Sequence, residues 1–63
     1  MRQTRARMVR PGDTIRNGKW TDTVDEVTER IGPDGNPQVM MRLNDDTATR
    51  FFHPLDWVEI SRG

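Results

Sequence analysis

Cysteine and tyrosine are absent from the chain, histidine occurs only at His53 and serine only at Ser61. The lack of cysteine excludes disulfides, thiolate zinc sites and cysteine nucleophiles. A single imidazole makes no histidine cluster for a metal ion, and no glycine-rich phosphate loop is present. The sequence therefore predicts a noncatalytic protein with neither a metal nor a cofactor.

Hydrophobic side chains are also scarce, at 32% of the 63 residues. A chain of this length folds as one small domain, and so thin a core disfavours a deep catalytic cavity. No apolar run approaches the ~20 residues of a membrane span, and the N-terminus lacks the apolar core of a signal peptide. We therefore expect a soluble, cytoplasmic protein with no membrane partner.

What is present is a series of short apolar stretches separated by strong turn signals, which is typical of an all-β fold. Asn17-Gly18 predicts a tight hairpin turn, because both residues tolerate positive φ. Residues 32–37 and 44–46 predict two further turns. The segments expected as strands are 9–16 (interrupted at Pro11-Gly12-Asp13), 20–30, 38–43, 47–52 and 57–60.

The alternation of side chains predicts which residues face the core. Val24 and Val27 are three residues apart, so we expect a β-bulge near Asp25-Glu26 that returns both valines to one face. The alternative at this position is a short helical turn. The later residues expected in the core are Val39, Met41, Leu43, Val58 and Ile60. Those expected to point outward are Met40, Arg42 and Trp57, while Phe51 and Phe52 point to opposite faces.

Two segments carry a resemblance to known small barrels. Val9-Arg10-Pro11-Gly12-Asp13-Thr14-Ile15 resembles the entry strand of KOW-type barrels, and residues 53–60, which begin His53-Pro54, resemble the helical turn and last strand of the Src-homology-3 fold. From Val9 to Ile60 the chain is similar to very short proteins of actinobacteria and their phages. The resemblance implies an all-β, five-stranded antiparallel Src-homology-3-like barrel over residues 8–61, with a one-turn 3-10 helix at Pro54-Leu55-Asp56 before the last strand.

The zero net charge hides an asymmetry between the two parts of the chain. The first ten residues carry four arginines and no acid, whereas residues 11–63 hold six basic and ten acidic side chains. We expect residues 1–7 to form a flexible basic arm. Such an arm either contacts phosphates or an acidic partner, or is only a solvated terminus.

The leading functional hypothesis is a small binding module that docks on a protein, either a host protein or a second copy of itself. Trp57 and Met40, with Arg42 and Arg50 beside them, have the composition of an interaction hot spot. Trp57 could instead fold over the open end of the barrel and seal the core. Trp20 is expected to be mainly structural, although its position near a loop tip allows it to join the docking surface.

The alternative hypothesis is nucleic-acid binding through phosphate contacts. The basic residues that would make these contacts are Arg2, Arg5, Arg7, Arg10 and Lys19. The overall neutrality and a pI near 6.5 disfavour this function. The open strand edges of a short barrel also suggest pairing with another copy, which would give a homo-oligomer.

Overall fold

The computed structural model describes residues 2–61 and shows one antiparallel sheet of six strands. A single short 3-10 helix accompanies the sheet, and the described residues contain no α-helix. The elements are β1 (Arg2–Arg5), η1 (Ala6–Met8), β2 (Thr14–Asn17), β3 (Trp20–Ile31), β4 (Pro37–Leu43), β5 (Ala48–Phe52) and β6 (Trp57–Ser61). The expected all-β class is confirmed.

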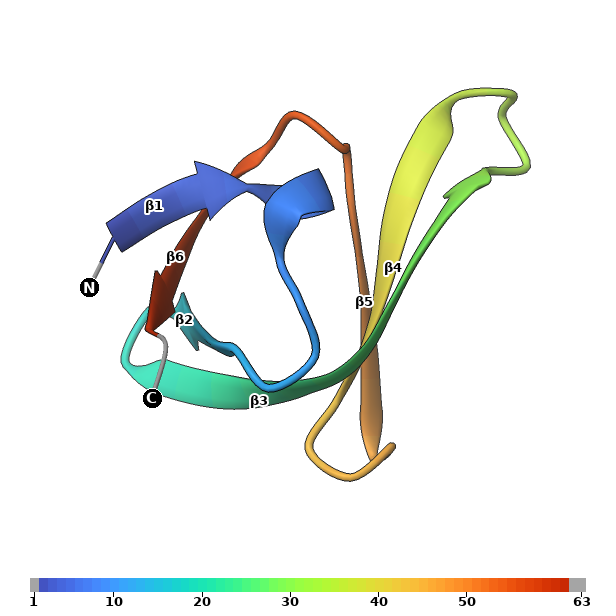
Figure 1. Cartoon of the computed structure of the whole chain (residues 1–63). Coiled ribbons are helices and arrows are strands. Elements are labelled where there is room, and N and C mark those ends of the chain that lie inside the picture. Colours follow the sequence, from blue (N-terminus) through green and yellow to red (C-terminus); the bar gives the residue numbers. More distant parts are fainter. Residues whose placement is uncertain (1, 62–63) are drawn as a thin grey trace.

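The strands follow the order β1-β6-β2-β3-β4-β5 across the sheet. The long strand β3 pairs with β2 through Trp20–Thr23 and with β4 from Val24 to Ile31, so it belongs to both halves of the curled sheet (Figure 1). The register shifts between Val24 and Glu26, which confirms the predicted bulge. This bulge returns Val27 to the face that Val24 occupies, and Val27 packs against the core.

The prediction of five strands was wrong. The sheet has a sixth strand, β1, and it does not close, because β1 pairs only with β6 and β5 pairs only with β4. The expected flexible arm is therefore largely a strand. Without β1 the outer edge of β6 would lie unpaired, and pairing with residues 2–5 satisfies its backbone groups.

The predicted 3-10 helix was placed in the wrong segment. Before β6 the chain makes a single turn, in which the Asp56 N–H donates to the His53 carbonyl at 2.9 Å and the His53 N–H donates to Asp56 Oδ2 at 2.9 Å. The 3-10 helix instead follows β1, and its Ala6 N–H donates to the Asp56 carbonyl at 2.8 Å. The two segments thus hold each other in place.

The core lies inside the curl of the sheet. The buried residues of the core are Ala6, Val9, Ile15, Val24, Val39, Met41, Leu43, Val58 and Ile60. The alternation predicted for β4 and β6 is confirmed. Ala6 and Val9 belong to the segment that connects β1 to β2, so this segment covers the core that the sheet leaves open. The N-terminal residues are therefore part of the domain.

The Pro11-Gly12-Asp13 turn has a structural role in this connection. Gly12 adopts a φ of 95°, a conformation that disfavours other residues, and its N–H donates to the Val24 carbonyl at 2.8 Å. The Val24 N–H in turn donates to the Asp13 carbonyl at 2.8 Å. The turn is thereby fixed to β3 at the residue that precedes the bulge.

Candidate docking surface and groove

Trp57 is 60% exposed on the outer face of β6. The outward position follows from alternation, because Val58 and Ile60 on the same strand are buried. The prediction that Trp57 points outward is confirmed. The indole ring does not cover the core, which is covered by Ala6 and Val9 instead.

Arg5 lies over this ring. Arg5 and Trp57 are partners in the register of β1 and β6, and the guanidinium carbon is 3.7 Å from the centroid of the ring. Arg5 Nη1 also donates to the Leu55 carbonyl at 2.7 Å. We call Arg5, Leu55 and Trp57 the Trp57 surface. It unites a residue predicted for phosphate contacts with one predicted for protein docking.

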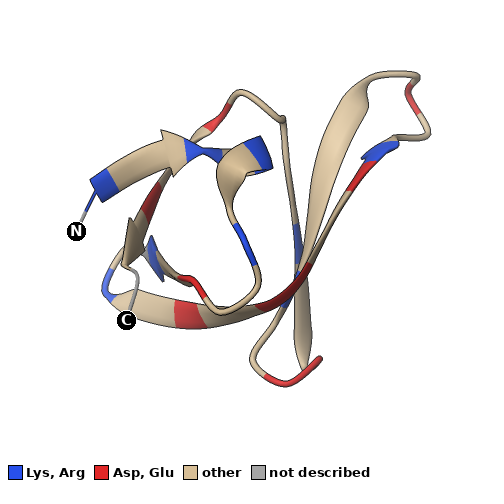
Figure 2. Cartoon of the chain, viewed as in Figure 1, with Lys and Arg blue, Asp and Glu red and all other residues tan. Residues whose placement is uncertain are grey.

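The four N-terminal arginines do not form one basic face. Arg2 is opposite the buried Ile60 and Arg5 opposite the exposed Trp57, so the two arginines lie on opposite faces of β1. Arg7 forms an ion pair with Glu29 at 3.6 Å. Lysine and arginine residues are spread over both ends of the molecule (Figure 2).

The other residues predicted for the docking face are not brought beside Trp57. Two strands, β2 and β3, separate β6 from β4 in the sheet. Met40 is half-buried, and Arg42 is paired with Glu26 at 3.6 Å and with Asp46 at 3.5 Å. Arg50 is opposite the buried Met41, on the other face from Met40 and Arg42. The single predicted face was therefore wrong, because alternation along β4 and β5 divides its members.

Trp20 lies apart from these residues at the β2–β3 turn and is 68% exposed. Its ring contact is with Lys19, whose Nζ is 6.0 Å from the centroid. The mainly structural role predicted for Trp20 is therefore not observed.

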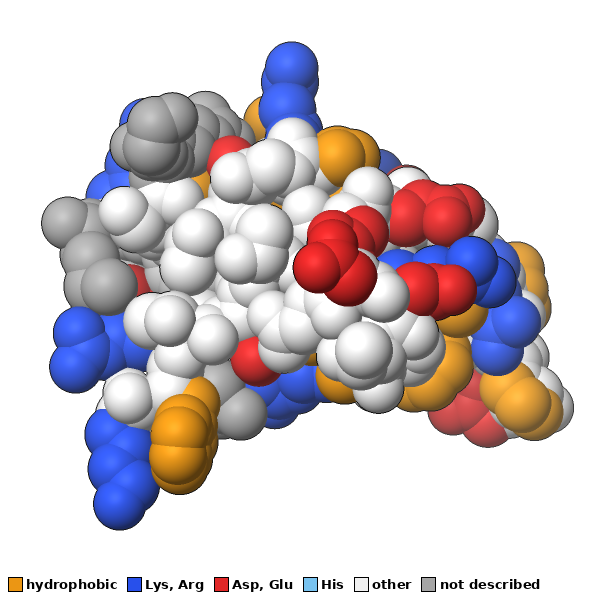
Figure 3. Space-filling model, turned by 90° about the horizontal axis from the view of Figure 1, so that it is seen from below, with side chains coloured by type: hydrophobic (Ala, Val, Ile, Leu, Met, Phe, Trp, Pro, Cys, Tyr) orange, Lys and Arg blue, Asp and Glu red, His pale blue; other side chains and the backbone are white. Residues whose placement is uncertain are grey.

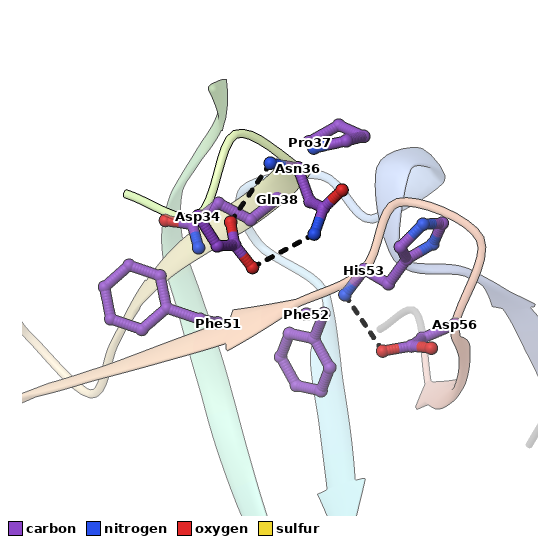
Figure 4. Close-up of a pocket in the computed structure, with 8 residues that line it drawn as sticks. All are labelled: Asp34, Asn36, Pro37, Gln38, Phe51, Phe52, His53 and Asp56. Carbon is purple, nitrogen blue, oxygen red and sulfur yellow. Dashed lines mark hydrogen bonds between the residues drawn. The ribbon is translucent and has the colours of Figure 1, made fainter. Parts of the chain in front are cut away.

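A groove of about 510 Å³ lies where β5 ends beside the loop between β3 and β4 (Figure 4). The lining residues are Asp34, Asn36, Pro37, Gln38, Phe51, Phe52, His53 and Asp56. The sequence analysis missed this groove. The only sequence signal for this groove is Pro54. This proline ends β5, so the first residues of β4 have no β5 residue paired with them.

Two sets of hydrogen bonds hold the walls of the groove in place. Asp34 Oδ1 accepts from the Asn36 N–H at 3.0 Å, and Asp34 Oδ2 accepts from Asn36 Nδ2 at 3.2 Å. The backbone bond first, and then the side-chain bond, hold the pKa of Asp34 below its ordinary value. On the other wall His53 Nδ1 accepts from the Leu55 N–H at 3.1 Å.

The outer face of the sheet offers a further hollow of about 260 Å³, lined by Asp25, Glu26, Arg42, Asp45 and Asp46. From below, the middle of the molecule is mostly uncharged, and acidic side chains gather at one side next to basic ones (Figure 3).

Among residues 2–61 no three acidic or histidine side chains are grouped to hold a metal ion. No helix in this part of the chain has the length and apolar character needed to cross a membrane.

The Trp57 surface and the groove are thus the two features with an arrangement suited to binding. The turn before β6 contributes Leu55 to the Trp57 surface and Asp56 to the groove. No protein-family model, curated protein or solved structure matches the chain.

Proposed function

We propose that this protein is a noncatalytic binding module that docks on a protein partner through the Trp57 surface. The observation that carries the proposal is the exposed Trp57 ring, held under the Arg5 guanidinium at 3.7 Å. Tryptophan and arginine are among the residues enriched at interface hot spots. A soluble domain gains nothing for its own core from a ring kept in this position.

The Trp57 surface is already ordered before a partner arrives. Arg5 is fixed by its stacking on Trp57 and by its bond to the Leu55 carbonyl. Side chains that are immobilised beforehand lose little conformational entropy when a complex forms. The surface therefore suits a partner that meets it as a rigid patch.

The chemistry of the partner follows from the same residues. The guanidinium has five N–H donors, and one bond to Leu55 leaves others for a carboxylate. Leu55 and Trp57 offer exposed apolar area next to them. We infer a partner segment in which an acidic side chain lies beside an apolar one.

The resemblance to short barrels of actinobacteria and their phages supports a cytoplasmic accessory protein with an Src-homology-3-like core. Strands β2 to β6 would form this core, and β1 would be an addition at the edge of β6. The free edges of β1 and β5 leave room for pairing with a second copy, which stays a prediction.

The test is a peptide array that presents acidic, basic and neutral segments with and without apolar side chains, probed with the labelled full chain. We expect binding to acidic–apolar segments and its loss in Trp57→Ala. Trp20→Ala is the matched control, since Trp20 is also exposed and also contacts a cation, and it should bind as the wild type does.

Nucleic acid is the outcome that would replace this proposal. Labelled single-stranded DNA, duplex DNA and RNA are titrated with the protein at about 50 and 200 mM salt, because phosphate contacts weaken steeply over this range. Salt-dependent binding that Trp57→Ala leaves intact, with no peptide bound, would assign the arginines to phosphates. Deleting residues 1–7 is unsuitable for this purpose because it removes β1 and the buried Ala6.

A further inference from the structure

The groove between the β3–β4 loop and the end of β5 has no part in the proposed docking. Its volume of about 510 Å³ lies within the range of roughly 300–1,000 Å³ usual for small-molecule sites. Both of its walls are held by hydrogen bonds within the chain. It is therefore a formed site whose ligand can be inferred from the groups left available.

The groove offers donors and acceptors together. Because His53 Nδ1 accepts a bond from the Leu55 N–H, a neutral His53 carries its proton on Nε2, which is then a donor. Gln38 Oε1 accepts from Arg30 at 2.9 Å, which leaves the Gln38 amide N–H groups as donors. The Asp56 side chain accepts through Oδ2 and the Asn36 side chain donates through Nδ2, so Asp56 Oδ1 and Asn36 Oδ1 are available acceptors.

The charges around the groove balance. The lining contains Asp34 and Asp56 but neither lysine nor arginine. Two cations contact its phenylalanine rings: the Arg30 guanidinium lies 5.5 Å from the Phe51 ring, and that of Arg50 lies 5.2 Å from the Phe52 ring. Two carboxylates and two guanidinium groups leave no excess of either sign, so a strongly charged ligand gains little here.

The exposed ring of Phe51 completes the groove. Phe51 is 51% exposed, whereas Phe52 lies on the opposite face of β5, is half-buried and packs against the core (Figure 4). The face of a phenyl ring is negative and attracts C–H groups that carry a small positive charge. A ligand that shows C–H groups on one face and hydroxyl groups around its rim would use both features.

We propose that the groove binds a neutral saccharide. The sugar ring would lie against Phe51, and its hydroxyl groups would bond to His53, Gln38, Asn36 and Asp56. A hydroxyl group donates and accepts at once, which matches the mixture of available groups. The site shares no lining residue with the Trp57 surface, so the two proposals can be tested with different variants.

The experiment is an NMR titration of the isotope-labelled full chain with three pyranoses of the same ring: glucose, glucosamine and glucuronate. Three further neutral sugars are tested in the same way: N-acetylglucosamine, a trisaccharide of glucose and a trisaccharide of N-acetylglucosamine. We expect neutral sugars to shift the amide signals of the groove residues, with a dissociation constant on the order of 1 mM. The amide of Trp20, at the distant β2–β3 turn, should not move.

Two variants test the assignment of the groups. Asp56→Asn keeps an oxygen for the His53 N–H and replaces the available oxygen by a donor, so we expect about tenfold weaker binding with the turn intact. Phe51→Ala should weaken binding to a similar extent, because Phe51 is not part of the core. Trp57→Ala and Thr49→Ala are the controls and should bind as the wild type does.

Three results would overturn the proposal. The first is the absence of groove shifts with every neutral sugar at concentrations of about 50 mM, well above the expected dissociation constant. The second is glucosamine or glucuronate binding at least about tenfold more tightly than glucose, which would make the groove a site for a charged group. The third is neutral-sugar binding that Asp56→Asn and Phe51→Ala both leave unchanged.

Discussion

Arg5 and Trp57 are opposite each other on neighbouring strands and lie in contact, with the guanidinium 3.7 Å from the centre of the indole ring. An antiparallel pair brings directly opposed side chains within reach, and this pair combines a cation with the aromatic ring that attracts it most strongly. The contact joins β1 to β6 on the outer face of the sheet. It also orders the surface proposed for docking.

The first prediction concerns the energy of this contact. A double-mutant cycle with Arg5→Ala and Trp57→Ala, measured by urea unfolding, should give a coupling of about 0.5–1 kcal/mol. A cycle of Arg5→Ala with Trp20→Ala should give none, because Trp20 contacts Lys19 instead. Equal couplings in the two cycles would contradict the structure.

The second prediction concerns β1. Removing residues 1–5 should lower the melting temperature by about 10 °C or more, because β6 loses its partner and the outer part of the curl opens. Circular dichroism on heating is the measurement. If residues 1–5 were a flexible arm, their removal would leave the melting temperature unchanged. Arg2→Ala is the control, and this single substitution should not change the melting temperature.

The third prediction compares two adjacent methionines. Met41 is fully buried, whereas Met40 points to the opposite face and is half-buried. Met41→Ala should lower the free energy of unfolding by about 2–5 kcal/mol, which is enough to unfold most molecules of so small a domain. Met40→Ala should cost about 1 kcal/mol or less in the same urea experiment. A larger loss for Met40→Ala than for Met41→Ala would mean that the assigned faces of β4 are reversed.

The fourth prediction concerns the β4–β5 turn, where Asn44, Asp45 and Asp46 all have positive φ, at 54°, 57° and 67°. Asp45→Gly should raise the unfolding free energy by about 0.5 kcal/mol, because glycine adopts this conformation without strain.

Asn44→Gly is the matched variant in the same turn. It should instead lose about 1 kcal/mol, because Asn44 Oδ1 accepts from the Thr23 N–H at 3.0 Å and Asn44 Nδ2 donates to Asp22 at 2.8 Å. Chemical denaturation of both variants is the measurement, and a gain for Asn44→Gly would show that these bonds do not stabilise the turn.

The fifth prediction concerns pH. The Asn36 backbone and side chain lower the pKa of Asp34 in the folded state, so the ionised carboxylate favours the folded loop. This contribution is present above the ordinary pKa of an aspartate and is lost as the pH falls through the lowered value. An NMR titration should find the pKa of the Asp34 carboxyl below that of a free aspartate. Asn36→Ala should raise the pKa of Asp34. No change in that variant would mean that a residue other than Asn36 lowers this pKa.

The local features of the fold could be predicted from the sequence. The bulge beside Asp25 followed from two valines at the wrong spacing, and the core residues of β4 followed from strict alternation. Trp57 could be placed outward for the same reason. Each of these depends on a few neighbouring residues, whose steric preferences decide the outcome.

The features that depend on distant residues could not be predicted. Arg2–Arg5 has no apolar alternation, and it forms a strand because β6 presents an unpaired edge to it. The groove depends on the place where β5 ends relative to β4, which no single segment encodes. The division of Met40 and Arg50 between two faces likewise required the register of the two strands.

The pairing of β1 with β6 also determines when the molecule can be completed. Residues 2–5 leave the ribosome before any other strand, but their partner, residues 57–61, emerges only after all the intervening strands. The strands from β3 to β5 pair with neighbours along the chain, so these contacts close only short loops and can form first. Trp57 meets Arg5 only when translation has passed Ser61.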